Sequence, residues 1–289
     1  MIDGWQWDST LFKGAAAYYE RGRLPYAPGF VEKLTEVLGL DGNGRLLDVG
    51  CGPGVVTLAL AAGVGEVVGV DPDDDMLAEA ERRAARLGVT NARWVAATAE
   101  DLPAGLGTGE FRAAVFAQSF HWTDRDRVAA TVLTMLEPGG AFVLIADLKD
   151  STGESVVPPP VPAPLVAPPY DEVRALIRRY LGPVRRGGQR SFPNGTPGMD
   201  EHLVLARAGF EPMERYVVPA GQLVERTADD VVAWTFSMSG SAPHLFEDRL
   251  AEFERDLRGL LREAAPDGRF VEPLVPTEIR ISRKPRGGE

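Results

Sequence analysis

Apolar and amphipathic segments alternate over the first half of the chain, and the alternation predicts strands that are each followed by a helix. Apolar runs predict buried strands at residues 45–49, 66–70, 92–96, 113–118 and 141–146. Helices are predicted at residues 55–62, at residues 74–87 with Gly88 as the stop, and after Thr123, which has capping-box spacing to Asp126. Five strand signals that alternate with helices favour an α/β fold, a doubly wound Rossmann-like parallel sheet.

The alternation stops near residue 150, and the rest of the chain predicts helices placed around later strands. More than half of the residues from Pro158 to Pro169 are proline, which predicts an extended connector. Later helices are predicted at residues 171–181, 197–208, 227–238 and 245–261, strands at 211–219 and 278–281, and a loop at 185–195. Two helices, at residues 12–19 and 30–40, are predicted before the first strand.

These segments divide the chain into a core and its additions. The predicted parts are a helical cap at residues 1–44, a Rossmann-like core at 45–150, a Pro-rich and helical insertion at 151–196, a continuation of the core at 197–221, a helical insertion at 222–275, and a last strand with its tail at 276–289. Insertions around later strands lie near the carboxyl ends of the strands, where such sheets bind ligands. We therefore expect the two insertions to form a lid.

The charge balance excludes several classes of partner. The chain has 31 Lys and Arg residues against 42 Asp and Glu residues, a formal net charge of −11. It lacks the positive footprint of a nucleic-acid binder, and anionic lipid would repel it. A single cysteine excludes an internal disulfide, no apolar run approaches the roughly 20 residues of a membrane span, and the N-terminus is unlike a secretory signal. We expect a cytoplasmic protein with a small-molecule partner, and the sequence predicts no oligomeric state.

Three glycines after the first strand, Gly50, Gly52 and Gly54, predict a ligand cradle. Missing side chains let a ligand approach the backbone, and the following helix begins with unpaired N–H groups. A dinucleotide-binding fold has a similar turn, so the glycines alone leave several nucleotides open. Asp48, two residues before Gly50, would repel a pyrophosphate, and the third glycine comes one residue too early for the dinucleotide fingerprint. The turn therefore favours a ligand that carries positive charge.

A second carboxylate, Asp71, ends the next predicted strand and is followed by Pro72. A carboxylate at this place can accept hydrogen bonds from both hydroxyls of a ribose, because it has two oxygens. A nucleoside with a cationic group near Asp48 indicates S-adenosylmethionine, whose sulfonium and ammonium groups outweigh its carboxylate.

Five segments in order carry a resemblance to a known family. They are residues 46–54 (LLDVGCGPG), 67–71 (VVGVD), 76–77 (ML), 99–103 (AEDLP) and 118–122 (QSFHW). Together they resemble class I S-adenosylmethionine-dependent methyltransferases, over residues 10–148. The last segment, with Tyr19 and residues 23–26 (RLPY), resembles the methyltransferase type 11 branch that includes trans-aconitate methyltransferase. One departure is Thr98, where relatives often carry Asp.

The resemblance implies a seven-stranded sheet, S-adenosylmethionine as the cofactor, and methyl transfer to an O, N or C atom of a small molecule, for example in bacterial secondary metabolism. It also assigns the cofactor contacts. The three glycines would line the methionine and ribose, Asp71 would bind the ribose, and Tyr19 and Arg23 would close over the methionine end. The other contacts would come from Asp48, Cys51, Pro72, Met76, Ala99, Glu100, Gln118 and Ser119.

Other side chains have two interpretations each. Cys51 could be a nucleophile, but a small side chain beside the cofactor is the simpler interpretation, since methyl transfer needs no nucleophile. Residues 73–75 are all Asp and favour a helix cap over a metal site. His121 is the candidate general base, although its place before Thr123 also suits a structural hydrogen bond. No metal site is predicted, since His202 and His244 lack metal-ligand spacing and favour structural roles.

The sequence leaves three functions to compare. A methyltransferase needs alignment and water exclusion, and it needs a base only if the acceptor must lose a proton. A non-catalytic S-adenosylmethionine-binding regulatory module would keep the same cradle. A nicotinamide-dependent oxidoreductase is disfavoured by Asp48 and by the glycine spacing. The arginines at positions 178, 179, 185, 186 and 190 could bind an anionic substrate or form a solvated basic face.

Overall fold

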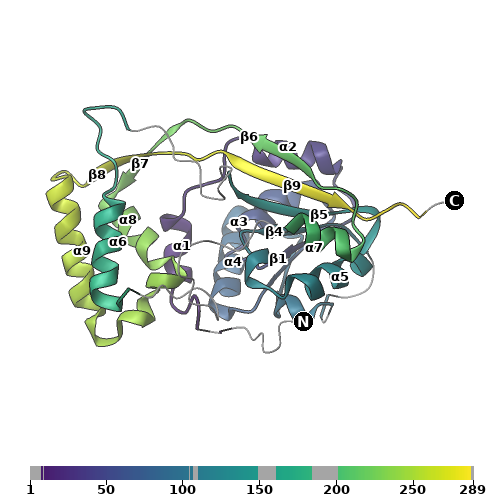
Figure 1. Cartoon of the computed structure of the whole chain (residues 1–289), viewed down its shortest axis with the longest axis horizontal. Helices are drawn as coiled ribbons and strands as arrows, with labels where there is room; N and C mark the ends of the chain where they lie inside the picture. The colour runs from purple at the N-terminus through teal and green to yellow at the C-terminus, as the bar shows by residue number, and fades with distance from the viewer. Residues whose placement is uncertain are drawn as a thin grey trace.

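The main body of the protein is a seven-stranded sheet with helices on both faces (Figure 1). The computed structural model describes residues 8, 10–103, 105–106, 110–148, 161–183 and 201–287. In spatial order the strands are β3 (Ala92–Ala96), β2 (Glu66–Asp71), β1 (Arg45–Val49), β4 (Phe111–Ala117), β5 (Leu136–Asp147), β9 (Thr277–Arg283) and β6 (Glu214–Val218). The predicted α/β fold is therefore confirmed.

The sheet is mixed, so the expectation of a wholly parallel sheet is wrong at one strand. β1 pairs in parallel with β2 and β4, whereas β9 runs antiparallel to both of its neighbours, β5 and β6. A short connection returns the chain from the helical part directly into β9, and the lack of a crossover helix there permits the antiparallel direction. The strand order changes direction between β1 and β4, which is the place where α/β sheets bind ligands.

Two hydrophobic clusters pack the helices against this sheet. Successive side chains of a strand point to opposite faces, and accordingly Leu46 and Leu47 of β1 belong to different clusters. On one face lie α2 (Phe30–Leu38) and α3 (Val55–Leu60), and on the other lie α5 (Arg125–Met135) and α7 (Glu201–Ala208). α4 (Asp74–Leu87) contacts β2 and β3. The core therefore covers both faces of the central strands.

A separate cluster of helices lies to one side of the sheet (Figure 1). Its elements are α6 (Tyr170–Leu181), α8 (Ala228–Phe236), α9 (Leu250–Ala264) and the antiparallel pair β7 (Leu223–Thr227) and β8 (Arg269–Pro273). We call these elements the helical module. It joins parts of the two predicted insertions around one aromatic core that includes Phe236, Phe246, Phe253 and Phe270. α1 (Ala16–Gly22) lies between the helical module and the helices of the sheet.

The structure corrects several predicted elements. The first helix begins at Ala16 instead of residue 12, because Gly14 has a φ of +79° and interrupts it. Asp124, and not Thr123, caps α5, since its carboxylate accepts the N–H of Arg127. Two strands, β7 and β8, were not predicted, and residues 243–249 form a 3₁₀ segment before α9.

Other predicted elements are confirmed or fall outside the described residues. α4 spans the predicted residues and ends at Gly88 in the left-handed conformation, and the predicted capping box of Thr227 and Asp230 begins α8. The predicted loop at residues 185–195 lies outside the described residues, as does the beginning of the proline-rich stretch. Among the described helices, none is both long and apolar enough to cross a membrane.

Candidate functional site

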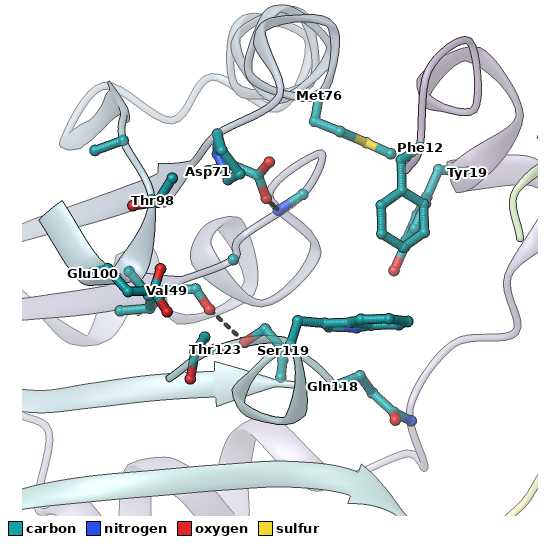
Figure 2. A pocket seen from close by; sticks show the side chains of 17 residues that line it. Phe12, Tyr19, Val49, Asp71, Met76, Thr98, Glu100, Gln118, Ser119 and Thr123 are labelled. Carbon is teal, nitrogen blue, oxygen red and sulfur yellow. Dashed lines mark hydrogen bonds between the residues drawn. The ribbon is translucent and has the colours of Figure 1, made fainter. Parts of the chain in front are cut away.

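A cavity opens at the carboxyl ends of β1, β2 and β4 (Figure 2). The empty space between its lining atoms is about 720 Å³, which includes open solvent at the mouth. The lining residues come from the N-terminal segment, the ends of these three strands and the turns that follow them, α4, and the segment after β3. They are Phe12, Tyr19, Val49, Gly50, Gly52, Asp71, Pro72, Met76, Ala97, Thr98, Ala99, Glu100, Ala117, Gln118, Ser119, Trp122 and Thr123.

The glycine turn forms the floor of the cavity and is tied to β2. The N–H groups of Gly50 and Cys51 both donate to the carbonyl of Val70, at 2.8 and 3.0 Å. Gly52 has a φ of +53°, and a Cβ added there would meet no protein atom within 4 Å. Because Gly52 lines the cavity, a side chain at this place would occupy the space that is open to a ligand.

Asp71 presents its carboxylate to the cavity from the end of β2 (Figure 2). Its Oδ2 accepts the N–H of Gly52 at 2.8 Å, and its Oδ1 accepts the N–H of Asp73 at 3.0 Å. An ionised carboxylate has about four acceptor positions, so each oxygen can still accept from a ligand. Burial raises the pKa of the Asp71 carboxyl to about 6, although both backbone hydrogen bonds act to lower it. A donor or a positive charge from a ligand would favour the ionised form.

The lining of the cavity is acidic. Its charged members are Asp71 and Glu100, and none of the lining residues is Lys or Arg. One oxygen of Glu100 accepts the N–H of Asp124 at 2.7 Å, whereas Oε2 is buried and has no hydrogen-bond partner among the described residues. Burial raises the pKa of this carboxyl as well. A ligand that donates hydrogen bonds fits such a lining, and a pyrophosphate does not.

Aromatic and thioether side chains form the wall opposite the acidic residues. Figure 2 shows Phe12 and Tyr19 on the far side of the cavity from Glu100 and Thr98. The ring of Phe12 meets that of Trp122 edge to face, with 6.2 Å between the centroids, and Met76 packs with the residues around Phe12. Aromatic faces attract cations, so this wall suits a positively charged group.

Most of the predicted cofactor residues line the cavity, and four do not. Asp48 is buried behind the turn, where its carboxylate accepts the hydroxyl of Thr57 at 2.5 Å and burial raises its pKa to about 7. Its Oδ1 has no hydrogen-bond partner among the described residues. Arg23 donates to the carbonyl of Ser237 at 2.8 Å and lies over the ring of Tyr19. Cys51 and Gly54 are the other two.

These two turn residues face the protein interior. The thiol of Cys51 is buried, which raises its pKa well above the usual value and disfavours the thiolate that a nucleophile needs. Gly54 is the residue before α3, with a φ of +74°, and a Cβ there would lie 2.7 Å from the ring of Trp94. Both residues shape the turn instead of lining the cavity.

His121 lies beside the cavity and is exposed, with its ring 4.7 Å from that of Trp122 between centroids. It is not one of the lining residues. Asp73 caps α4 by accepting from the N–H groups of Asp75 and Met76, as its position in the acidic run predicted. Within the described part of the chain, no three His, Cys, Asp or Glu residues are grouped as metal ligands.

Several of the lining residues are not included in the predicted cofactor contacts. They are Phe12, Val49, Ala97, Thr98, Ala117, Trp122 and Thr123. Ala97 and Ala117 follow or end strands whose ends were predicted to bind the ligand, so strand boundaries alone could have indicated them. Phe12 is different, because it reaches the cavity only through the fold of the N-terminal segment.

The family comparison agrees with this geometry. The family model described as a methyltransferase domain matches residues 46–140, which contain the glycine turn, Asp71 and the end of β4. An uncharacterized methyltransferase of Mycobacterium tuberculosis is 34% identical over 146 residues, or 49% of this chain and 54% of that protein. The uncharacterized methyltransferase YcgJ of Bacillus subtilis is 33% identical over 101 residues, or 35% of this chain and 40% of that protein. The chain thus spans about half the length, or less, of these curated relatives.

Solved structures show the same fold at low identity. The crystal structure of YcgJ from Bacillus subtilis superposes with a TM-score of 0.50 at 16% identity, covering 89% of this chain and 98% of that chain. The cyclase SpnF gives a TM-score of 0.51 at 21% identity, covering 96% of this chain and 93% of that chain. Residues 46–140 are therefore a methyltransferase domain, and the sheet that contains them has the fold of the class I S-adenosylmethionine-dependent methyltransferases.

Proposed function

We propose that the chain binds S-adenosylmethionine in the cavity at β1, β2 and β4 and transfers its methyl group to a small molecule. The observation that carries the proposal is the Asp71 carboxylate, which is directed into an open cavity that has acidic side chains and no basic one in its lining. This charge pattern suits a nucleoside with a cationic sulfur and opposes a dinucleotide, whose pyrophosphate would meet two carboxylates.

The cavity offers a partner for each part of this cofactor. Asp71 would accept the two ribose hydroxyls with the acceptor positions that Gly52 and Asp73 leave unused. Ala99 and Glu100 would contact the adenine. Gly52 would leave room for the sugar and the methionine chain. Tyr19 and Phe12 would cover the sulfonium end.

Arg23 and Asp48 would act at the same end from outside the lining. Arg23 is held by the carbonyl of Ser237 and by the ring of Tyr19, so pairing with the methionine carboxylate requires a new position of its guanidinium. Asp48 would add negative charge behind the turn. We assign it this electrostatic role because its oxygens face Thr57 and the protein interior.

When bound, S-adenosylmethionine supplies an electrophilic methyl group. The residues of the chain then have two tasks, which are to align the acceptor with that methyl group and to exclude water. Gln118 and Ser119 directly follow β4 beside the cavity and would position the acceptor. His121 is the candidate base for an acceptor that must lose a proton, and its exposed ring lies next to Trp122 of the lining.

The acceptor is proposed only by class. The net charge of −11 disfavours nucleic acid, and the helical module would shape a pocket for a small molecule with an O, N or C acceptor. The QSFHW segment at residues 118–122 supports the branch that includes trans-aconitate methyltransferase.

Two measurements test the proposal. Isothermal titration should show binding of S-adenosylmethionine and of its demethylated product, S-adenosylhomocysteine, and no binding of either at millimolar concentration would contradict it. Incubation of the protein with an extract of the producing cells and methyl-labelled S-adenosylmethionine should then give a labelled small molecule. Binding without transfer would favour the regulatory module instead. Titration with NADH, followed by its fluorescence, should show no binding.

A further inference from the structure

The helix that carries Tyr19 is attached to the helical module more closely than to the sheet. α1 packs mainly along α8, and on the sheet side it contacts α4, where Glu20 pairs with Arg83 and Arg86. Arg21 of α1 donates to Asp230 of α8 at 2.7 Å, and Arg23 donates to the carbonyl of Ser237, just past the end of α8. The segment that forms one wall of the cavity is therefore held from the module.

One buried arginine forms the centre of this attachment. Arg226, at 5% exposure, donates to the carbonyl of Gly22 at 2.7 Å and to that of Asp230 at 3.1 Å. It thereby bonds the last residue of α1 and the first turn of α8 with one guanidinium group. Glu272 lies 3.9 Å from its Nε and accepts the hydroxyl of Tyr170 at 2.6 Å, which links the arginine to α6.

Gly22 permits the close approach that these hydrogen bonds require. A Cβ at this position would lie 2.5 Å from the backbone carbonyl group of Ala233, and 2.6 Å from the N of Trp234. These contacts are backbone atoms, so no side chain could move to make room. Any larger residue at position 22 has to push α1 away from α8.

The same segment reaches the module at its other end. His244 Nδ1 lies 2.9 Å from the carbonyl of Lys13, next to Phe12 of the cavity wall. Tyr19, the other wall residue, is three residues before Gly22 and therefore one helical turn from the Arg226 hydrogen bond. Phe12 and Tyr19 therefore lie between two contacts, one with His244 before α9 and one with Arg226 of the module.

We propose that Arg226 is a positioning residue for the cofactor cavity, which acts by holding α1, and with it Tyr19, against the helical module. The assignment of the ligand rests on the proposed function, whereas the attachment of α1 does not. Because coupling between two sites is reciprocal, a bound cofactor that contacts Tyr19 also stabilises the packing of α1 on the module. Occupancy of the cofactor site is in this way transmitted to the part of the molecule that would hold the acceptor.

Arg226→Met tests this by removing the donors while it keeps an apolar stem. Two quantities are measured: the amide hydrogen exchange of residues 16–22 without ligand, and the dissociation constant of S-adenosylhomocysteine by titration. We expect both the exchange rate and the dissociation constant to rise about tenfold, within the usual range of coupling between sites. Exchange in β1 should stay as in the wild type. Arg226→Lys, which keeps the charge on a shorter side chain without the planar guanidinium, should give an intermediate result.

A matched control and a second variant guard against loss of folding. Arg179→Met removes another arginine of the module, which pairs with Asp256 at 2.8 Å between α6 and α9, and it should change neither quantity more than twofold. Gly22→Ala perturbs the attachment from the α1 side, and it should reproduce the effect of Arg226→Met. The proposal is overturned if Arg226→Met and Gly22→Ala leave α1 exchange and affinity within twofold of wild type. It is equally overturned if Arg179→Met matches them.

The two arms of the experiment separate this proposal from the proposed function. If the wild-type protein binds no S-adenosylhomocysteine, the proposed function fails, and the exchange of residues 16–22 still decides whether Arg226 holds α1. If the ligand binds and α1 exchange rises in Arg226→Met without any change in affinity, the positioning role is wrong although the attachment exists.

Discussion

The sheet and the helical module are packed on separate aromatic cores that are built in similar ways. In the sheet, Phe142 is fully buried and stacks on Phe116 with 4.6 Å between ring centroids. In the module, Phe253 is fully buried and stacks on Phe246 at 4.0 Å. The two cores differ in how continuous their sequences are. The core of the sheet is mostly built from residues 45–147, whereas the core of the module joins segments on both sides of residue 200. The cofactor cavity lies where α1 bridges them.

This difference indicates separate roles for the two regions in ligand binding and in local motion. The sheet supplies the polar groups that bind a nucleoside, and these groups sit at strand ends and tight turns that tolerate little movement. Two short links join the sheet to the β7–β8 pair of the module, since residues 219–222 connect β6 with β7 and residues 274–276 connect β8 with β9. A region with its own core and short connections can open locally while the sheet stays folded.

The largest expected effects come from a matched pair of core substitutions. Phe142→Ala should lower the free energy of unfolding of the sheet by about 3 to 5 kcal/mol, and Phe253→Ala should cost about as much within the module. Hydrogen exchange at β1 should therefore increase in Phe142→Ala and stay near wild type in Phe253→Ala. If β1 and α9 lose protection together in Phe253→Ala, the two regions are one cooperative unit and the comparison is wrong.

Removal of the ribose-binding carboxylate should give the next largest effect. Asp71→Ala should weaken S-adenosylhomocysteine binding by about 1.5 to 3 kcal/mol, because it removes the acceptor of two charged hydrogen bonds. Asp71→Asn keeps the size of the side chain and one acceptor oxygen, so its affinity for S-adenosylhomocysteine should lie between those of the wild type and of Asp71→Ala. Asp126→Ala, which removes an exposed carboxylate paired with Arg207, is the control. Titration calorimetry measures all three, and an Asp71→Ala affinity equal to wild type refutes the assigned role.

A matched pair of helix caps should give smaller effects. Thr227 accepts the N–H of Asp230 at the start of α8, and Asp73 accepts the N–H groups of Asp75 and Met76 at the start of α4. Each change to Ala should cost about 1 kcal/mol. Thr227→Ala should raise hydrogen exchange in the module and in α1, whose Arg21 donates to the Thr227 hydroxyl at 3.4 Å. Asp73→Ala should weaken cofactor binding, since Met76 of the same helix lines the cavity. If Asp73→Ala raises exchange in the module and leaves cofactor binding unchanged, the sheet and the module do not respond separately.

The pH dependence of binding should give the smallest effect. Burial raises the pKa of Asp71 to about 6, so this group is ionised in the free protein at pH 7.5 and mostly protonated at pH 5.5. Ribose hydroxyls and a sulfonium favour the ionised carboxylate, and acid therefore weakens binding. One proton with this pKa gives about fourfold lower affinity at pH 5.5 than at pH 7.5. Asp71→Asn should flatten the titration profile, and a profile that is equally steep in this variant excludes Asp71 as its source.

The same raised pKa has a consequence for stability. A carboxyl whose pKa is higher in the folded than in the unfolded protein favours the folded state in acid, and this contribution is lost as the pH rises from about 4 through 6. Burial raises the pKa of Asp48 to about 7. Its contribution to stability is therefore also lost as the pH rises, up to about pH 7. Bound cofactor should offset the loss by stabilising the ionised form of Asp71.

Much of the sheet could be predicted from the sequence because its signals are local. Buried parallel strands are continuous apolar runs, α4 is marked by an Asp cap and a Gly stop, and Asp71 ends a strand that such a run defines. β7 and β8 could not be predicted, since five-residue strands such as Leu223–Thr227 carry mixed polar and apolar residues. Their pairing depends on a contact between segments more than forty residues apart.

The site was predictable to the same extent. Residues at the ends of β1, β2 and β4 follow from the strand pattern, whereas Phe12 and the surroundings of Arg23 depend on how α1 packs against the module. Asp48 shows a further limit, because its charge was readable from the sequence but its orientation toward Thr57 was not. Burial and side-chain direction are set by tertiary packing, which a short motif does not encode.

A crystal structure of the chain with S-adenosylhomocysteine tests the central claim most directly. We predict that the ligand lies in the cavity at β1, β2 and β4, with its ribose hydroxyls donating to the carboxylate of Asp71, its adenine beside Ala99 and Glu100, and its sulfur near Tyr19. A ligand bound elsewhere, or one in this cavity without a ribose contact to Asp71, would contradict the account.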